Sequence, residues 1–140
     1  MLNNLNKTYF ICILLCSLVK SQDVSISVGD VSTAGYTSNI PVPINLTSSN
    51  ENIGGFQFDV TVTPAMINLT GVTTVGPATE FSADFSLLNN GNYRVIFYKG
   101  SNAEGLNADI NTEVMALQFS GSDVLSAVLE IKLSNVIVSS

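Results

Sequence analysis

The sequence contains no histidine and no tryptophan, and its two cysteines, Cys12 and Cys16, lie near the start of its 140 residues. Histidine is the commonest general base and metal ligand, and a cysteine thiolate is needed for thiol nucleophiles and for zinc–thiolate sites. A Ser-His-Asp triad cannot be built without histidine. The sequence also lacks a glycine-rich phosphate loop and an acidic calcium loop. We therefore predict that the protein is not an enzyme and holds no metal or cofactor.

A pair of carboxylates is what remains for catalysis, as in glycoside hydrolysis. The spacing of the acidic residues singles out no pair. Acidic residues ordinarily lie at solvated positions on strands and in loops. The candidates are Asp59, Glu80, Asp84, Glu104, Asp109 and Glu130.

Residues 1–21 have the order of a secretory signal peptide: Lys7, then an apolar run from Tyr9 to Val19, then small and polar residues. The apolar run is shorter than the roughly 20 residues that span a bilayer. Val19 and Ser21 suit a cleavage site, so the mature chain would begin near Gln22. We predict a secreted or cell-surface protein with a single domain over residues 22–140 and no membrane insertion once the signal is removed.

The predicted mature domain is strongly acidic. Both cysteines leave with the signal, and Arg94, Lys99 and Lys132 then stand against eleven acidic residues, a net charge of −8. Such a domain repels nucleic acid and anionic lipid. About 119 residues can bury roughly two-thirds of their unfolded surface without disulfides. The last predicted strand runs to the final residue, which leaves open a domain truncated at its C-terminal end.

Apolar and polar residues alternate in nearly every informative segment, as they do in half-buried strands. Behind a double glycine, Phe56, Phe58, Val60 and Val62 share one side of a predicted strand. Similar alternation covers residues 24–28, 40–46, 81–88, 93–98, 115–119 and 125–133. Only residues 103–111 could hold a short helical turn. Many short strands separated by Gly, Asn and Ser turns predict an all-β fold, a two-sheet β-sandwich of about eight or nine strands.

Local signals add detail to this sandwich. Asn90-Gly91 predicts the turn of a hairpin. Pro41 and Pro43 predict an edge strand, because proline cannot donate to a strand ladder. Phe81 and Phe85 share a strand face and are expected to be core residues.

The same alternation predicts an outer face. If Phe56 and Phe58 point into the core, Gln57 and Asp59 point outward. The other side chains expected to point outward are Arg94, Ile96, Tyr98, Ala116, Gln118, Val128, Glu130 and Lys132. This mixture suits a non-obligate interface and also suits an ordinary solvated sheet. A flat sugar-binding platform of three aromatic rings is disfavoured, since only three tyrosines remain after residue 21.

Three stretches in a fixed order resemble the cohesin domain, within the superfamily of bacterial carbohydrate-binding sandwiches. They are VGDVSTAGYTSNIPVPINLTSS, NIGGFQFDVTVTPAMINLTGV and VLEIKLSNVIVSS. The matching motifs are Gly29-Asp30, Gly35-Tyr36-Thr37, Ile40 to Ile44, Gly55 to Pro64 and Leu133 to Val136, within a span from about Val24 to Ser139.

The resemblance implies a jelly-roll sandwich that captures dockerin modules through one flat sheet face, which includes the third, fifth, sixth and eighth strands. On that face the resemblance places Gly55, Gln57 and Asp59 on the third strand. It places Arg94, Ile96 and Tyr98 on the fifth. With the outward side chains above, the predicted partner-binding face is Gly55, Gln57, Asp59, Arg94, Ile96, Tyr98, Gln118 and Glu130.

Our first hypothesis is therefore a secreted, non-catalytic, cohesin-like module. Its partner would be a dockerin-type or other extracellular protein in a polysaccharide-degrading or cell-surface assembly. Two alternatives stay open: direct carbohydrate binding by the same sandwich, and an architectural adhesin-type domain with no ligand of its own.

Overall fold

The computed structural model describes residues 24–31, 39–48, 52–101, 104–107, 112–121 and 130–139. The predicted signal peptide lies outside these residues. So do Gly35-Tyr36-Thr37, Asp109, Val128 and most of the predicted helical turn.

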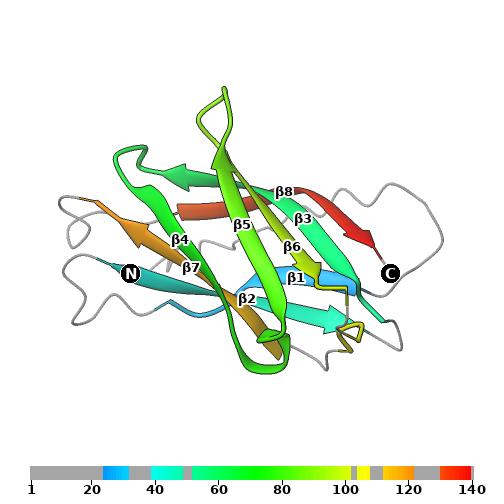
Figure 1. The fold of residues 1–140 in the computed structure, drawn as a ribbon. Coiled ribbons are helices and arrows are strands. Elements are labelled where there is room, and N and C mark those ends of the chain that lie inside the picture. Colours follow the sequence, from blue (N-terminus) through cyan, green and yellow to red (C-terminus); the bar gives the residue numbers. More distant parts are fainter. Residues whose placement is uncertain are drawn as a thin grey trace, which may run out of the picture.

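Two antiparallel sheets of four strands each form the described molecule (Figure 1). The first sheet has the order β1-β2-β7-β4, made of β1 (Val24–Val28), β2 (Ile40–Ser48), β7 (Thr112–Ser120) and β4 (Asn68–Thr74). The second has the order β5-β6-β3-β8, made of β5 (Phe81–Leu87), β6 (Tyr93–Lys99), β3 (Gly55–Thr63) and β8 (Glu130–Ser139). A short 3-10 helix, η1 (Gly76–Ala78), connects β4 to β5. The predicted all-β sandwich is confirmed.

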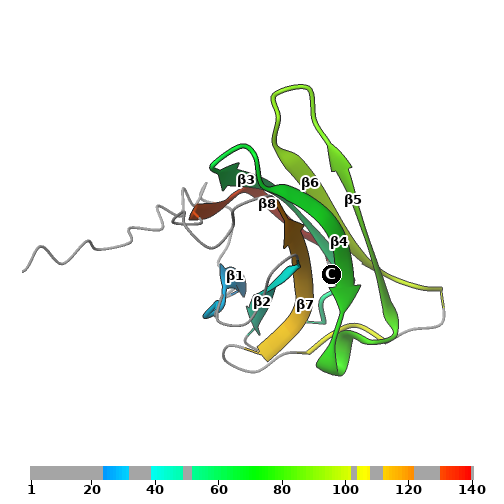
Figure 2. The same cartoon turned by 90° about the vertical axis from the view of Figure 1, so that its left-hand side faces the viewer.

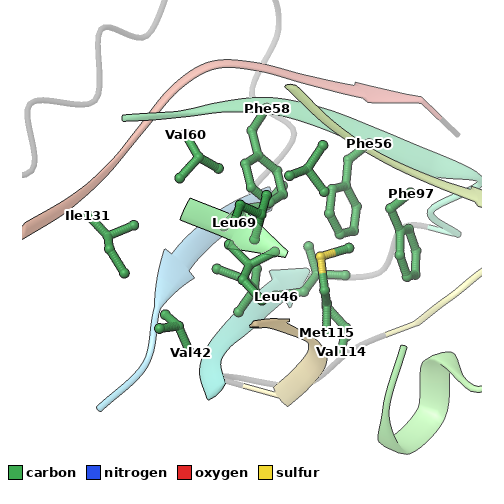
Figure 3. Close-up of a cluster of buried hydrophobic side chains, with 14 of the residues drawn as sticks. Val42, Leu46, Phe56, Phe58, Val60, Leu69, Phe97, Val114, Met115 and Ile131 are labelled. Atoms are coloured by element: carbon green, nitrogen blue, oxygen red, sulfur yellow. The ribbon is translucent and has the colours of Figure 1, made fainter. Parts of the chain in front are cut away.

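The core lies between the two sheets and is built mostly from alternate residues of the strands (Figure 3). Phe58 and Val60 of β3 are fully buried, as are Leu46 of β2 and Met115 of β7. The ring of Phe97 on β6 stacks against Phe56 with centroids 4.3 Å apart. Each such side chain contributes about 1.5–3 kcal/mol by leaving water. The phenylalanines of β3 therefore fix which side of that strand faces outward.

Strand β4 was not predicted from the sequence. Its register against β7 shifts between Leu69 and Gly71, so its apolar residues do not alternate strictly. A bulge of this kind inserts one extra residue and hides the period of two. One consequence is that Arg94, Ile96 and Tyr98 lie on β6, not on the fifth strand as expected.

The prediction of an edge strand at Pro41 and Pro43 is wrong. β2 lies between β1 and β7, although β1 pairs only with Ile44–Ser48. The carbonyl of Pro43 accepts from the amide of Gly29, so this residue directs its backbone groups toward the β1 side. In an antiparallel pair, residues two apart point the same way. Both missing N–H groups therefore fall on that side, and neither proline costs the ladder with β7 a hydrogen bond.

The hairpin between β5 and β6 is confirmed. Gly91 has a positive φ of 84° and donates its amide to Leu88, and the amide of Leu88 donates to Asn92. Figure 2 shows this hairpin projecting beyond the other sheet. As a result Phe81 is buried as expected, whereas Phe85, on the same side of β5, is 36% exposed.

Candidate binding face

The two sheets present two outer surfaces. We call the outer surface of the sheet β5-β6-β3-β8 the β3–β6 face, and that of the sheet β1-β2-β7-β4 the β2–β7 face. Residues that pair across strands point to the same side, so the register decides which side chains share a face. The β3–β6 face carries Ser82, Asp84 and Ser86 of β5; Arg94, Ile96 and Tyr98 of β6; Gly55, Gln57, Asp59 and Thr61 of β3; and Lys132, Ser134 and Ile137 of β8.

A row with two exposed apolar residues crosses the middle of the β3–β6 face. Gln57 pairs with Ile96 on one side and with Ile137 on the other, and Ile96 pairs with Asp84. Ile96 is 42% exposed and Ile137 is 61% exposed. Tyr98, in the next row, is 43% exposed. These side chains supply apolar area on a strand framework that the core holds in place.

Ile137 was missing from the predicted face. Ile131 and Leu133 point inward, so strict alternation would also turn residue 137 inward. Asn135 has a positive φ of 50°, and the register of β8 against β3 shifts between Gln57 and Asp59. This bulge reverses the alternation, so Ile137 points outward and Val138 packs against the core. The signal for this bulge in the sequence was Asn135 itself, because asparagine is disfavoured in strands.

Asp59 is the centre of a polar cluster on this face. Arg94 Nε donates to Asp59 Oδ1 at 2.8 Å and Arg94 Nη2 donates to Oδ2 at 3.0 Å. Asn135 Nδ2 also donates to Oδ2, at 2.8 Å. Asp59 is only 3% exposed. The bonds tie three strands of one sheet to each other.

The cluster keeps Asp59 ionised. The hydrogen bond from Arg94 is the main cause that lowers the pKa of Asp59; burial opposes it, and Asn135 and the positive charge of Arg94 add to the lowering. The same pair raises the pKa of Arg94. A carboxylate occupied in this way cannot act as a proton donor at neutral pH. Its role is to orient Arg94, whose side chain is 37% exposed.

The remaining predicted residues lie around this centre. The Tyr98 hydroxyl donates to Asp84 Oδ2 at 3.2 Å. Glu130, the first residue of β8, forms an exposed ion pair with Lys132, whose Nζ lies 3.0 Å from Glu130 Oε1. Gly55 sits where β3 and β6 approach closely, since a Cβ there would lie 2.6 Å from the carbonyl oxygen of Phe97.

The structure separates Gln118 from the other predicted residues, which is a correction. Gln118 lies on β7 and pairs with Pro41 and Gly71, so it belongs to the β2–β7 face, as does Ala116. Alternation shows that a side chain points outward but not from which sheet. The other seven predicted residues lie on strands of the β3–β6 sheet.

Neither a metal site nor a membrane span is found in the part of the chain that the structure describes. No three His, Cys, Asp or Glu residues there come together as metal ligands. No helix among those residues is long and apolar enough to cross a bilayer.

Comparison with known proteins gives structural matches only. The sequence matches no protein-family model and no curated protein sequence. One similar structure is the sixth cohesin from scaffoldin B of Acetivibrio cellulolyticus, in complex with a mutant Cel5 dockerin. It is 18% identical with a TM-score of 0.58, over 80% of this chain and 82% of that one.

Two further matches agree. The type I cohesin–dockerin complex Coh-OlpA-Doc918 from Clostridium thermocellum is 17% identical with a TM-score of 0.57, over 79% of this chain and 81% of that one. A non-cellulosomal cohesin from the archaeon Archaeoglobus fulgidus is 15% identical with a TM-score of 0.52, over 73% of this chain and 67% of that one. Identities this low speak for the fold alone. Taken with the two antiparallel four-stranded sheets, they show that this chain has a cohesin-like fold.

Proposed function

We propose that the chain is a non-catalytic module that binds a dockerin-type or other protein partner through its β3–β6 face. The observation that carries this proposal is the row Ile96–Gln57–Ile137, which exposes apolar side chains on a sheet packed against a dry core. Two of the similar cohesins are complexes with dockerins. That likeness supports a partner of this class.

The face suits rigid docking. A standard interface buries about 800 Å² on each partner, and partners that hold their shape lose little entropy on binding. The backbone of the face is fixed by its ladders, and Arg94 is held by two hydrogen bonds to Asp59. Tyrosine and arginine are among the residues that contribute most to binding at interfaces. Tyr98 and Arg94 would then flank the two isoleucines as anchors.

The charge pattern favours the same surface. Two of the three basic residues after position 21, Arg94 and Lys132, lie on this face, in a chain that has eleven acidic residues. Here Asp59 is paired with Arg94 and Glu130 with Lys132. The face therefore offers charges of both signs at defined positions, which gives specificity toward a partner with a complementary pattern.

Calorimetry against a panel of purified dockerins tests the proposal. We expect binding to at least one dockerin, weakened about tenfold or more by the double substitution Ile96→Ala with Ile137→Ala, which removes apolar area from the centre of the patch. Gln118→Ala on the opposite face is the matched control and should leave the affinity unchanged. Absence of heat with every dockerin, or equal weakening by both variants, would contradict the proposal.

A pull-down on insoluble cellulose, chitin and xylan distinguishes the carbohydrate alternative. Retention on one polysaccharide that Tyr98→Ala abolishes would assign the face to sugar, because Tyr98 is its one exposed aromatic residue among those described. We expect no retention.

We also propose that the module is exported and acts in an extracellular polysaccharide-degrading or cell-surface assembly. The support is the order of charged, apolar and small residues in the first 21 positions. N-terminal sequencing of the protein recovered from its native source should begin near Gln22. A mature protein that retains Lys7 would contradict cleavage.

A further inference from the structure

β5 is an edge strand whose outer edge is unpaired in the described part of the chain. It is the first strand of its sheet and pairs only with β6. The carbonyl of Phe81 is turned away from β6, since it accepts a hydrogen bond from Thr74 Oγ1 of β4. The amide of Leu88 is turned toward β6, since it donates to Asn92. Because direction alternates in an antiparallel pair, Ala83, Phe85 and Leu87 direct their backbone groups to the open edge.

The other three sheet edges carry features that discourage strand addition. β8 contains Lys132 and a bulge at Asn135. β4 has a register shift between Leu69 and Gly71. β1 is only five residues long. Short strands, bulges and lysines are the devices by which proteins protect edges.

β5 lacks these features. It is seven residues long, contains no proline, lysine or arginine, and keeps an unbroken register with β6. Of the four edges, it is the one best shaped to accept another strand.

The side chains beside this edge differ on its two sides. On the inner side, Phe85 is 36% exposed and Leu87 is 65% exposed, because the hairpin extends beyond the other sheet (Figure 2). Phe85 and Leu87 form an apolar strip on this side. The ring centroid of Phe85 lies 6.3 Å from that of Tyr93, so Tyr93 packs beside the strip. On the outer side lie Ser82, Asp84 and Ser86. A strand added here would meet an apolar strip on one side and a hydroxyl and carboxylate strip on the other.

We propose that the open edge of β5 binds an extended segment of another polypeptide by strand addition, in which apolar side chains alternate with basic ones. Main-chain hydrogen bonds to Ala83, Phe85 and Leu87 would supply affinity, and alternate side chains would supply selectivity. The preference for a basic partner strand follows from charge. Asp84 lies on β5, Glu80 directly precedes the first residue of β5, and β5 itself contains no basic residue. A second copy would bring two acidic chains together, so a basic partner is the better match.

The proposal does not depend on the proposed function. The edge of β5 adjoins the β3–β6 face, and Asp84 pairs with Ile96 of the row Ile96–Gln57–Ile137. The backbone groups of Ala83, Phe85 and Leu87 lie outside that row, so protection of their amides tests the edge separately.

Hydrogen exchange measured by NMR tests the proposal with a capped peptide of sequence Lys-Val-Lys-Val-Lys-Val-Lys. We expect the amides of Ala83, Phe85 and Leu87 to exchange about tenfold more slowly when the peptide is bound. The amides of Ser82, Asp84 and Ser86, which already face β6, should not change. A peptide of the same composition in the order Lys-Lys-Val-Val-Val-Lys-Lys is the control for attraction by charge alone, and it should give no such alternating protection.

Two variants at one position separate backbone pairing from side-chain contact. Leu87→Pro removes an outward N–H and should weaken the peptide about tenfold or more, while the ladder to β6 keeps its bonds. Leu87→Thr keeps the N–H and should stay within about threefold of the original affinity. If the proline variant fails to fold, Phe85→Lys places a protective lysine on the edge and should abolish peptide binding.

Three results would overturn the proposal. One is protection by both peptides alike, or by neither. Another is protection centred on the amides of Gln57 and Ile96, because it would place the peptide on the β3–β6 face. The third is concentration-dependent dimerisation that protects the same three amides without peptide, because it would assign the edge to a second copy.

Discussion

The two outer faces of the sandwich rest on one core but carry different chemistry. The four strands of the β2–β7 face contain a single charged residue, Glu113, and otherwise present short hydroxyl, amide, proline and glycine groups. The β3–β6 face carries the buried Asp59 with Arg94 and Asn135, together with exposed isoleucines and a tyrosine. Both faces cover the same core, so the difference between them is one of surface chemistry: the β3–β6 face adds charge-assisted hydrogen bonds and exposed apolar side chains.

The largest expected effect compares one strand glycine from each face. Gly55→Ala should destabilise the protein by about 1–3 kcal/mol, because its Cβ would lie 2.6 Å from the carbonyl oxygen of Phe97 and force β3 and β6 apart. Gly71→Ala on the β2–β7 face meets nothing nearer than 3.7 Å and should be neutral or slightly stabilising. Urea unfolding of both variants measures the difference. Equal stability of the two would show that the β3–β6 pairing is looser than described.

The Asp59 cluster should be the next most sensitive feature. Asp59→Asn removes charge-assisted hydrogen bonds to Arg94, and we expect a loss of about 1–2 kcal/mol, reduced from the fully buried case because the Arg94 side chain is partly exposed. Asp84→Asn is the matched control on the same face. It changes an exposed carboxylate and should stay within about 0.5 kcal/mol. A similar loss in both would mean that surface charge, and not the cluster, supplies the stability.

The same cluster predicts a pH dependence. The pKa of Asp59 is lowered from its ordinary value of 3.8, so the unfolded chain takes up this proton at a higher pH than the folded one. The stability that the carboxylate contributes is therefore complete well above pH 3.8 and is lost as the pH falls through that value toward the folded pKa. Unfolding of the original protein and Asp59→Asn between neutral and acid pH should show curves that converge below pH 4 or so. A gap that stays constant would exclude this titration as the cause.

The smallest effect is expected on the β2–β7 face. Gln118→Ala removes a half-buried side chain with no charge and should change stability by less than about 0.5 kcal/mol. It should also leave dockerin affinity unchanged. A marked loss of binding in this variant would reverse the assignment of the two faces.

Much of this comparison could be predicted from local patterns. Alternation around Phe56 and Phe58 correctly placed Gln57 and Asp59 on the outer side, and Asn90-Gly91 marked the hairpin turn. Both signals act over a few neighbouring residues, where backbone geometry dominates. The pattern failed at β4 and at Asn135, because in each case a bulge adds a residue and reverses the alternation. The prolines of β2 also led to a wrong prediction. β2 lies between β1 and β7, but Pro41 and Pro43 lie beyond the residues of β2 that pair with β1.

The sequence by itself determined which side chains point inward along most strands and which kinds of chemistry the protein lacks, because a period of two and a residue inventory are local properties. Only the tertiary structure decided that Gln118 belongs to the other sheet and that Asn135 reaches Asp59 from 76 positions away. Sheet membership depends on how all the strands together bury their apolar sides. No single segment carries that information.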